Sequence, residues 1–229
     1  GERVTYLRGF GSASIETGAP VAPDTLFQIG SATKMLTAAA VMSAYLAKAL
    51  DVDAPMSRYV SGLTACVGAP TVRQLLSHTG GLMDEPDEFG PQGEEGLAAY
   101  PRTWTAEYCL LPPGRAFSYS NSGFALAGLA LQEAEQKPFA DVVKARVLEP
   151  LGMTRTTFRP TEAMTWPLAI GHRRDQAGAF SAVRPLPNDA RLWPAGTVYS
   201  SAQEMARLVV ALLNDGRVLL VGGEDIGNS

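Results

Sequence analysis

The stretch Phe27-Gln28-Ile29-Gly30-Ser31-Ala32-Thr33-Lys34-Met35 decides how the rest of this sequence is interpreted. A short apolar run ends at Gly30, and residues 31–50 are rich in Ala, Leu and Met, which favour a helix because they lose little rotamer freedom there. Residues three apart lie on one face of a helix, so Lys34 can bring its amine to the Ser31 hydroxyl. The stretch therefore predicts a serine–lysine pair on the first turn of a helix.

This pair is suited to nucleophilic catalysis. A serine hydroxyl is a weak nucleophile at neutral pH and needs a neighbouring base. A lysine can supply one where burial or another cation disfavours the charged amine. The backbone N–H of Ser31 lies at the positive end of the predicted helix dipole, where it can stabilise an oxyanion. The alternative is that Ser31 only caps the helix and that Lys34 is a solvated surface side chain.

A second candidate group, Tyr119-Ser120-Asn121, follows the helix-breaking segment Pro112-Pro113-Gly114. A tyrosine close to a lysine loses its phenolic proton more easily and can relay protons between nucleophile and leaving group. Asn121 offers both a donor and an acceptor, which suits it to orient Lys34 and to bind a substrate amide. The simpler alternative is a turn and a helix N-cap, which is compatible with the catalytic role.

The surroundings of both groups resemble one family throughout the chain. The stretch 27–35 resembles the nucleophile segment of class C β-lactamases, DD-peptidases and the esterases of that superfamily. Further similarities follow in the same order: a helix-and-turn segment at 72–82, a second motif at 113–121, and later landmarks at 148–153 and 194–200. Related class A enzymes carry S-D-N at the second motif, so the Tyr-x-Asn of this chain favours the class C side.

The resemblance implies a role for each candidate residue. Ser31 is acylated, Lys34 and Tyr119 transfer protons, and Asn121 positions the substrate and Lys34. The Ser31 N–H contributes to the oxyanion site. No cofactor and no metal are implied.

The resemblance also implies an α/β, β-lactamase/transpeptidase-like fold, in which helices flank an antiparallel sheet and a mostly helical region is inserted. Residues 1–60 and 196–229 are expected to form the sheet-bearing part, and residues 61–195 the helical part. A third motif, K-T-G or H-x-G, is not found, and Val221-Gly222-Gly223 is the nearest substitute. We therefore expect a chain that is incomplete at both ends, with a further segment or a second polypeptide completing the sheet.

Periodicity and turn residues predict the remaining elements. Val4–Gly11 is predicted to be a strand, and residues 84–96 a surface loop. Recurrent apolar residues predict which face of the 31–50 helix is buried: Met35, Ala38, Ala39, Met42, Leu46 and Ala49. Further helices are expected over 71–78, 122–136, 138–148 and 201–213. The last is expected to be capped by Ser200 or Ser201, with Glu204 placed for a capping box.

Composition excludes several classes of protein. The 229 residues carry a net charge of −4, with 46% hydrophobic and 18% charged residues, which is typical of a soluble globular protein. An acidic balance gives no reason to expect nucleic acid or an anionic membrane as partner. The apolar runs are too short for a membrane span. The protein is predicted to be soluble, and periplasmic, secreted and cytoplasmic locations all stay open.

Cysteine and histidine are scarce. Cys66 and Cys109 form no C-x-x-C pair, and we interpret them as buried free thiols, with one disulfide as the alternative. With only His78 and His172, a structural zinc site is not expected. A histidine-based triad is disfavoured because no G-x-S-x-G occurs, and a structural role is expected for His78 at its helix end.

The predicted substrate is a small-molecule ester, amide or lactam. A carboxylesterase acting on small esters is the preferred hypothesis. A β-lactamase and a D-amino-acid or DD-peptidase are the alternatives within the same chemistry. A non-catalytic penicillin-binding or interaction module is the alternative from another class, and it predicts slow acylation without release.

Overall fold

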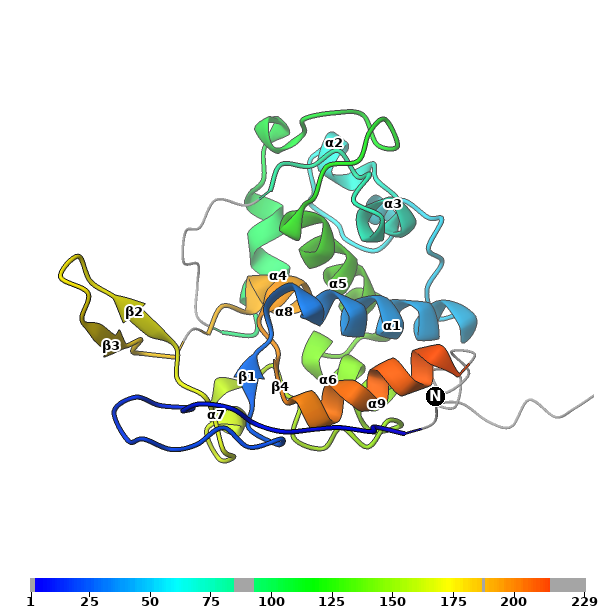
Figure 1. The fold of residues 1–229 in the computed structure, drawn as a ribbon. Helices are drawn as coiled ribbons and strands as arrows, with labels where there is room; N and C mark the ends of the chain where they lie inside the picture. Colours follow the sequence, from blue (N-terminus) through cyan, green and yellow to red (C-terminus); the bar gives the residue numbers. More distant parts are fainter. Residues whose placement is uncertain (1–2, 85–92, 187, 215–229) are drawn as a thin grey trace, which may run out of the picture.

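A computed structural model of the chain describes residues 3–84, 93–186 and 188–214. The most buried helix among them, α5 (Asn121–Glu135), is apolar on nearly every side, so other helices surround it. It packs against α1 (Thr33–Leu46), α3 (Val72–Leu76), α6 (Phe139–Val143) and α8 (Trp193–Gly196), as Figure 1 shows. The core of the described part is therefore helical.

Short helices and turns connect these elements. The short α-helical ones are α2 (Ala65–Gly68), α4 (Gly96–Ala99) and α7 (Pro160–Ala163). The longer α9 (Ala202–Leu213) is the last described element. Single turns of 3-10 helix cover Gly30–Ala32, Met56–Arg58, Tyr100–Thr103, Ala106–Tyr108 and Ala190–Leu192. A π-helical turn, Lys144–Leu148, follows α6 directly, so the helix predicted over 138–148 changes its winding midway.

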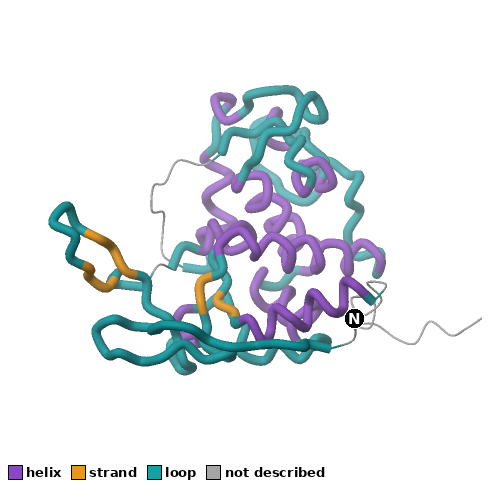
Figure 2. Tube along the Cα trace, in the orientation of Figure 1, coloured by secondary structure: helices purple, strands orange, loops and turns teal. Residues whose placement is uncertain are grey.

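Two small antiparallel sheets lie at the margin of the helices (Figure 2). In the first, β1 (Phe27–Gln28) pairs with β4 (Tyr199–Ser200), with Phe27 opposite Ser200. In the second, β2 (His172–Arg174) pairs with β3 (Phe180–Ala182) in a hairpin that projects from the body in Figure 1. The predicted division of the chain stays a prediction. It places 1–60 and 196–229 in one part, and the pairing of β1 with β4 links these two segments; residues 61–195 form the other part.

The strand predicted over Val4–Gly11 is wrong for the described residues. This segment is extended beside α9, but no strand is described next to it, and a strand exists only through a backbone partner. The nearest pairing is an isolated bridge between Ser12 and Pro20. The loop predicted over 84–96 lies mostly outside the described residues.

The predicted buried face of the nucleophile helix is right for Ala39, which is buried, but wrong for three of its larger side chains. Met35, Met42 and Leu46 are 42%, 36% and 54% exposed, whereas Leu36 and Val41 are fully buried. The helix has apolar side chains on both faces, so spacing could not distinguish the covered face from the uncovered one. The face toward α5 and α8 is the buried one.

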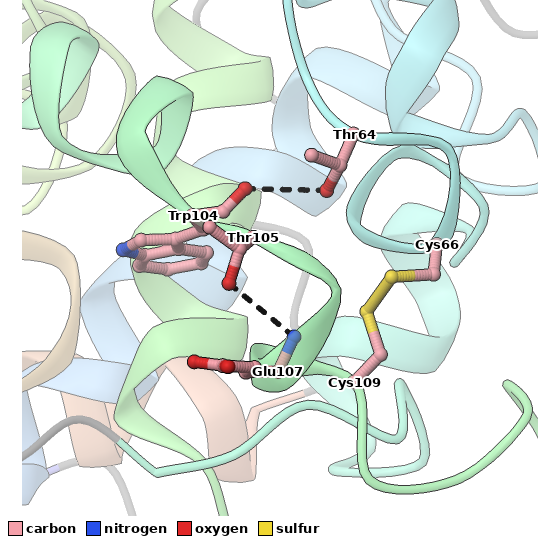
Figure 3. Close-up of a disulfide and its surroundings, with 6 residues drawn as sticks. All are labelled: Thr64, Cys66, Trp104, Thr105, Glu107 and Cys109. Atoms are coloured by element: carbon pink, nitrogen blue, oxygen red, sulfur yellow. Dashed lines mark hydrogen bonds between the residues drawn. A yellow bond between two sulfur atoms is a disulfide. The ribbon is translucent and has the colours of Figure 1, made fainter.

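The two cysteines form a disulfide, which corrects the prediction of free thiols (Figure 3). Cys66 is the second residue of α2, and Cys109 follows the 3-10 turn Ala106–Tyr108. Their Cα atoms lie 6.3 Å apart, within the range that a disulfide spans. A separation of 43 residues gives no sign of this closeness in the sequence. Close by, the Thr64 hydroxyl donates to the carbonyl of Trp104, so the two segments meet at more than one point (Figure 3).

The side chain of Glu204 makes other hydrogen bonds than those of the predicted capping box. The Ser201 hydroxyl accepts the Glu204 N–H at 3.2 Å, as expected for an N-cap. The Glu204 carboxylate, however, accepts the N–H of Arg155 at 3.0 Å and the hydroxyl of Thr156 at 2.5 Å. It is buried, and it ties α9 to the segment before α7.

Candidate active site

Ser31 lies in a 3-10 turn that leads directly into α1. Gly30, just before it, has φ +57°, a left-handed conformation that glycine adopts without steric cost. The turn is held because the Thr33 hydroxyl donates to the Gly30 carbonyl at 2.7 Å and the Ile29 N–H donates to Val198 at 3.0 Å. The sharp turn leaves the Ser31 side chain exposed at the start of the helix.

Lys34 is only 8% exposed, although it carries an amine. Its Nζ donates to Oδ1 of Asn121 at 2.7 Å and to the carbonyl of Ala195 at 2.6 Å. It also lies 3.3 Å from Oγ of Ser31. The two shorter contacts hold the amine beside the serine from both flanking helices, α5 and α8, and offset the cost of its burial.

Tyr119 makes the shortest contact with the serine. Its hydroxyl lies 2.7 Å from Oγ of Ser31, and Nζ of Lys34 lies 4.8 Å from the centre of its ring. Burial raises the pKa of Tyr119, but hydrogen bonds to Lys34 and Ser31 and the charge of Lys34 outweigh burial. The pKa of Tyr119 therefore lies below the ordinary value for a phenol, which increases the fraction of phenolate that is available to accept the proton of Ser31.

Asn121 is the first residue of α5, and both polar atoms of its amide are engaged by the protein. Oδ1 accepts from Lys34, and Nδ2 lies 3.4 Å from the carboxylate of Asp84. Asp84 also accepts the backbone N–H of Asn121 at 2.7 Å. These contacts orient the amide with its oxygen toward Lys34.

His78 also reaches this group of residues. Its ring stacks on the ring of Tyr119, with centroids 4.5 Å apart and planes 28° apart. Its Nδ1 accepts the N–H of Ser120 at 3.1 Å. Burial, followed by the charge of Lys34, lowers the pKa of His78 below that of a free imidazole, so the neutral form is favoured.

The structure thus brings the predicted residues Ser31, Lys34, Tyr119 and Asn121 together, although the two pairs lie almost 90 residues apart in sequence. Sequence reasoning missed three contributors: the Ala195 carbonyl, the Asp84 carboxylate and the His78 ring. For Ala195 and His78 a signal was present, because both lie in segments that resemble family landmarks. No such signal marks Asp84.

Other sequence predictions concern what surrounds the site. Val221-Gly222-Gly223, the candidate third motif, lies outside the described residues. Across residues 3–84, 93–186 and 188–214 no group of His, Cys, Asp and Glu side chains could hold a metal ion. Within the same ranges, no helix is both long and apolar enough for a membrane crossing.

Comparison with known proteins identifies the family. The Beta-lactamase family matches residues 1–225, so the chain belongs to that family. Penicillin-binding protein 4 of Amycolatopsis lactamdurans is 27% identical over 208 residues, which are 87% of this chain and 54% of that protein. The chain spans about half the length of the curated relatives it matches.

Two solved structures carry the same fold. The octameric penicillin-binding protein homologue from Pyrococcus abyssi is 26% identical, with a TM-score of 0.85 over 96% of this chain and 52% of that one. The β-lactamase/D-alanine carboxypeptidase from Pseudomonas syringae is 28% identical, with a TM-score of 0.74 over 93% of this chain and 59% of that one. The predicted β-lactamase/transpeptidase-like fold is confirmed.

Proposed function

We propose that the chain carries the nucleophile of a serine hydrolase that works through an acyl-enzyme at Ser31. The observation that supports it most directly is the 2.7 Å contact between the Ser31 and Tyr119 hydroxyls beside the buried amine of Lys34. A nucleophile, a proton acceptor and a cation that favours the acceptor's charged form are the parts that acyl transfer requires.

In the proposed mechanism Tyr119 is the base and Lys34 its electrostatic partner. Tyr119 takes the hydroxyl proton of Ser31 as Oγ bonds to the substrate carbonyl carbon, and the backbone N–H of Ser31 stabilises the oxyanion that forms. When the tetrahedral intermediate breaks down, the C–O bond to the alcohol is cleaved and Tyr119 returns the proton to the departing oxygen. Water then attacks the acyl carbon while Tyr119 takes its proton. The bond between the acyl carbon and Oγ of Ser31 is cleaved, the carboxylic acid leaves, and Tyr119 returns the proton to Oγ.

Asn121 is proposed to position Lys34. Its oxygen holds the amine at 2.7 Å, and Asp84 engages its nitrogen on the other side. The second part of its predicted role, binding a substrate amide, stays a prediction.

We infer that small carboxylic esters are the substrates. The support is the state of the Asn121 amide: Lys34 engages Oδ1 and Asp84 faces one N–H of Nδ2, which leaves a single amide N–H for a substrate. A lactam or a D-peptide carries an acylamino group, whose N–H and carbonyl both need a hydrogen-bonding partner in the site. A small ester has no acylamino group and needs no such partner. The names of the relatives, penicillin-binding protein and β-lactamase/D-alanine carboxypeptidase, favour the second candidate, a lactam or D-alanyl peptide substrate.

Covalent labelling tests the nucleophile. Intact-mass spectrometry after exposure to an activated phosphonate is expected to show one adduct, which is absent in Ser31→Ala. The matched control is Ser61→Ala, because Ser61 is exposed and far along the chain from the site, and its adduct should be unchanged. An adduct that survives Ser31→Ala means that another residue is the nucleophile.

A substrate panel tests the class. Short p-nitrophenyl esters, a chromogenic cephalosporin and a D-alanyl-D-alanine peptide are compared at equal protein concentration. Ester turnover should exceed the other two. Strong lactam turnover with negligible ester turnover contradicts the ester proposal, and slow acylation without release supports a penicillin-binding module instead.

A further inference from the structure

His78 occupies an unusual backbone position at the end of α3. Its φ of +57° is left-handed, a conformation in which His, Asn and Asp are enriched among non-glycine residues. Its carbonyl accepts the N–H of Ser118 at 2.8 Å, and its Nδ1 accepts the N–H of Ser120 at 3.1 Å. His78 therefore holds the backbone on both sides of Tyr119.

The imidazole ring completes this support. It stacks on Tyr119, meets the edge of Phe117 with centroids 5.6 Å apart, and lies 5.1 Å from the centre of Phe124. Tyr119 is itself 41% exposed, so solvent covers part of its ring and His78 backs another part. A tyrosine that must hold its hydroxyl 2.7 Å from Ser31 needs such a backing, because an exposed side chain otherwise samples other rotamers.

We propose that His78, in its neutral form, is a positioning residue for Tyr119. Its ring fixes the plane of the phenol, and its Nδ1 fixes the backbone of the next residue. This inference rests on the proposed function, because a position matters only if Tyr119 transfers a proton.

The protonation state of His78 follows from its contacts. Nδ1 accepts a hydrogen bond from the N–H of Ser120. Once protonated, Nδ1 is itself a donor and can no longer accept this bond. The charged and titratable groups that act on His78 are Lys34, which disfavours its protonation, and Asp84, which favours it. Tyr119 faces it across the stack. Protonation of His78 therefore breaks the support for Tyr119 and adds a cation near Lys34.

His78→Asn isolates the ring. Asparagine tolerates the left-handed backbone and offers Oδ1 to the Ser120 N–H, so only the stacking surface is lost. With the phosphonate probe we expect the rate of labelling at saturating probe to fall about tenfold, which corresponds to about 1.4 kcal/mol. That is the size of one well-formed aromatic contact. The concentration for half-maximal rate and the final labelled fraction should stay at the wild-type values, because folding and probe binding are preserved.

The pH profile separates positioning from a purely structural role. In the wild type, the logarithm of the labelling rate should fall with a slope of one as Tyr119 is protonated, and should steepen toward two at the acid end as His78 is protonated as well. In His78→Asn the slope should stay at one. The control is His172→Asn, which changes the second histidine of the chain, located in the β2–β3 hairpin. This variant should keep the wild-type labelling rate and the slope of two at low pH.

The outcomes are distinguishable. If the wild type is not labelled, or Ser31→Ala is, the proposed function fails and the inference with it. If labelling depends on Ser31 but His78→Asn reacts at the wild-type rate with the wild-type profile, only the inference fails. If His78→Asn has a reduced labelled fraction, the rate is taken per labelled molecule: a rate about tenfold below that of the wild type supports positioning by the ring, and the wild-type rate overturns it.

Discussion

At the scale of single residues, the amine of Lys34 and the hydroxyl of Tyr119 compete for the proton of Ser31. Both lie within hydrogen-bonding distance of Oγ, but the tyrosine is closer, at 2.7 Å against 3.3 Å. Lys34 is also occupied by two protein acceptors, Asn121 and Ala195. These contacts favour a division of labour in which Tyr119 accepts the proton and Lys34 lowers its pKa.

The pH dependence of acylation tests this division. The charged form of Tyr119 is the active one, so the rate should fall as pH drops through its pKa, which lies below 10. Tyr119→Phe should lower the rate by roughly 100- to 10,000-fold, as is usual for the loss of a general base, and should remove this dependence. Lys34→Ala should cost several powers of ten and move the rise to higher pH, because the group that lowers the tyrosine pKa is gone.

The measurement is the labelling rate of each variant between about pH 5 and 10, with thermal unfolding as a control for folding. A near-normal rate in Tyr119→Phe rules out the phenolate route and leaves a neutral Lys34 as the base. If neither substitution changes the rate, the mechanism proposed above is wrong.

At the scale of elements, α8 controls the site through its backbone. Its residues Pro194 and Ala195 present carbonyls to Thr37 and Lys34 of α1, at 2.7 Å and 2.6 Å. α8 can lie this close to α5 because Gly128 has no side chain: a Cβ there would stand 2.3 Å from Cγ of Pro194. The helix contact and the lysine contact are therefore coupled.

Gly128→Ala should destabilise the protein, although alanine normally favours a helix. The clash with Pro194 is expected to cost about 1–3 kcal/mol and to displace α8, which lowers the labelling rate as well. Gly123→Ala in the same helix is the matched control, since its nearest neighbour is 3.5 Å away, an ordinary contact, and it should keep or raise the unfolding temperature. Equal behaviour of the two variants in thermal unfolding contradicts this account.

The disulfide is a second link between elements. It closes a loop of 43 residues that contains α2, α3 and α4. Such a closure removes conformational freedom from the unfolded chain, so Cys66→Ala combined with Cys109→Ala should lower the free energy of unfolding by roughly 2–4 kcal/mol. Denaturant unfolding of oxidised protein, reduced protein and the double variant measures it. If the oxidised protein and the double variant unfold at one denaturant concentration, the bond is not formed in solution.

The sequence predicted the elements better than their partners. The helices α1, α5 and α9 begin within two residues of the expected positions, because caps and apolar spacing are local properties. The pairing of Cys66 with Cys109, the covered face of α1 and the second role of Glu204 depend on contacts between distant residues. The candidate site was predicted through its motifs, but Asp84 lies in no motif, and only the folded chain brings it to Asn121.

At the scale of the whole molecule, the described residues cover α1 on one side only. Met35, Met42 and Leu46 follow one another along one face of α1 and are exposed, and Leu212 and Leu213 of α9 are exposed as well. Clustered exposed apolar side chains of this kind are uncommon on monomeric soluble proteins. We therefore expect residues 1–229 to bind a hydrophobic dye or to self-associate through this face.

Met42→Glu tests that expectation. The side chain is partly solvated, so the free energy of unfolding should change by no more than about 0.5 kcal/mol. Dye binding or self-association, followed by fluorescence and by light scattering, should decrease. Ser61→Glu, which adds the same charge at an exposed position outside α1 and α9, should leave both unchanged. A monomeric wild type that binds no dye contradicts the prediction.

The contacts of Lys34 and Ser31 have a consequence for how the chain reaches its native state. Ser31 and Tyr119 are 88 residues apart, and Lys34 and Ala195 are 161 residues apart. Long loops close slowly because their ends must first lose entropy, whereas helices form locally within microseconds. During refolding from denaturant, helical circular dichroism should therefore recover before the capacity to react with a phosphonate. Reactivity at Ser31 becomes a marker of the last long-range closures rather than of helix formation.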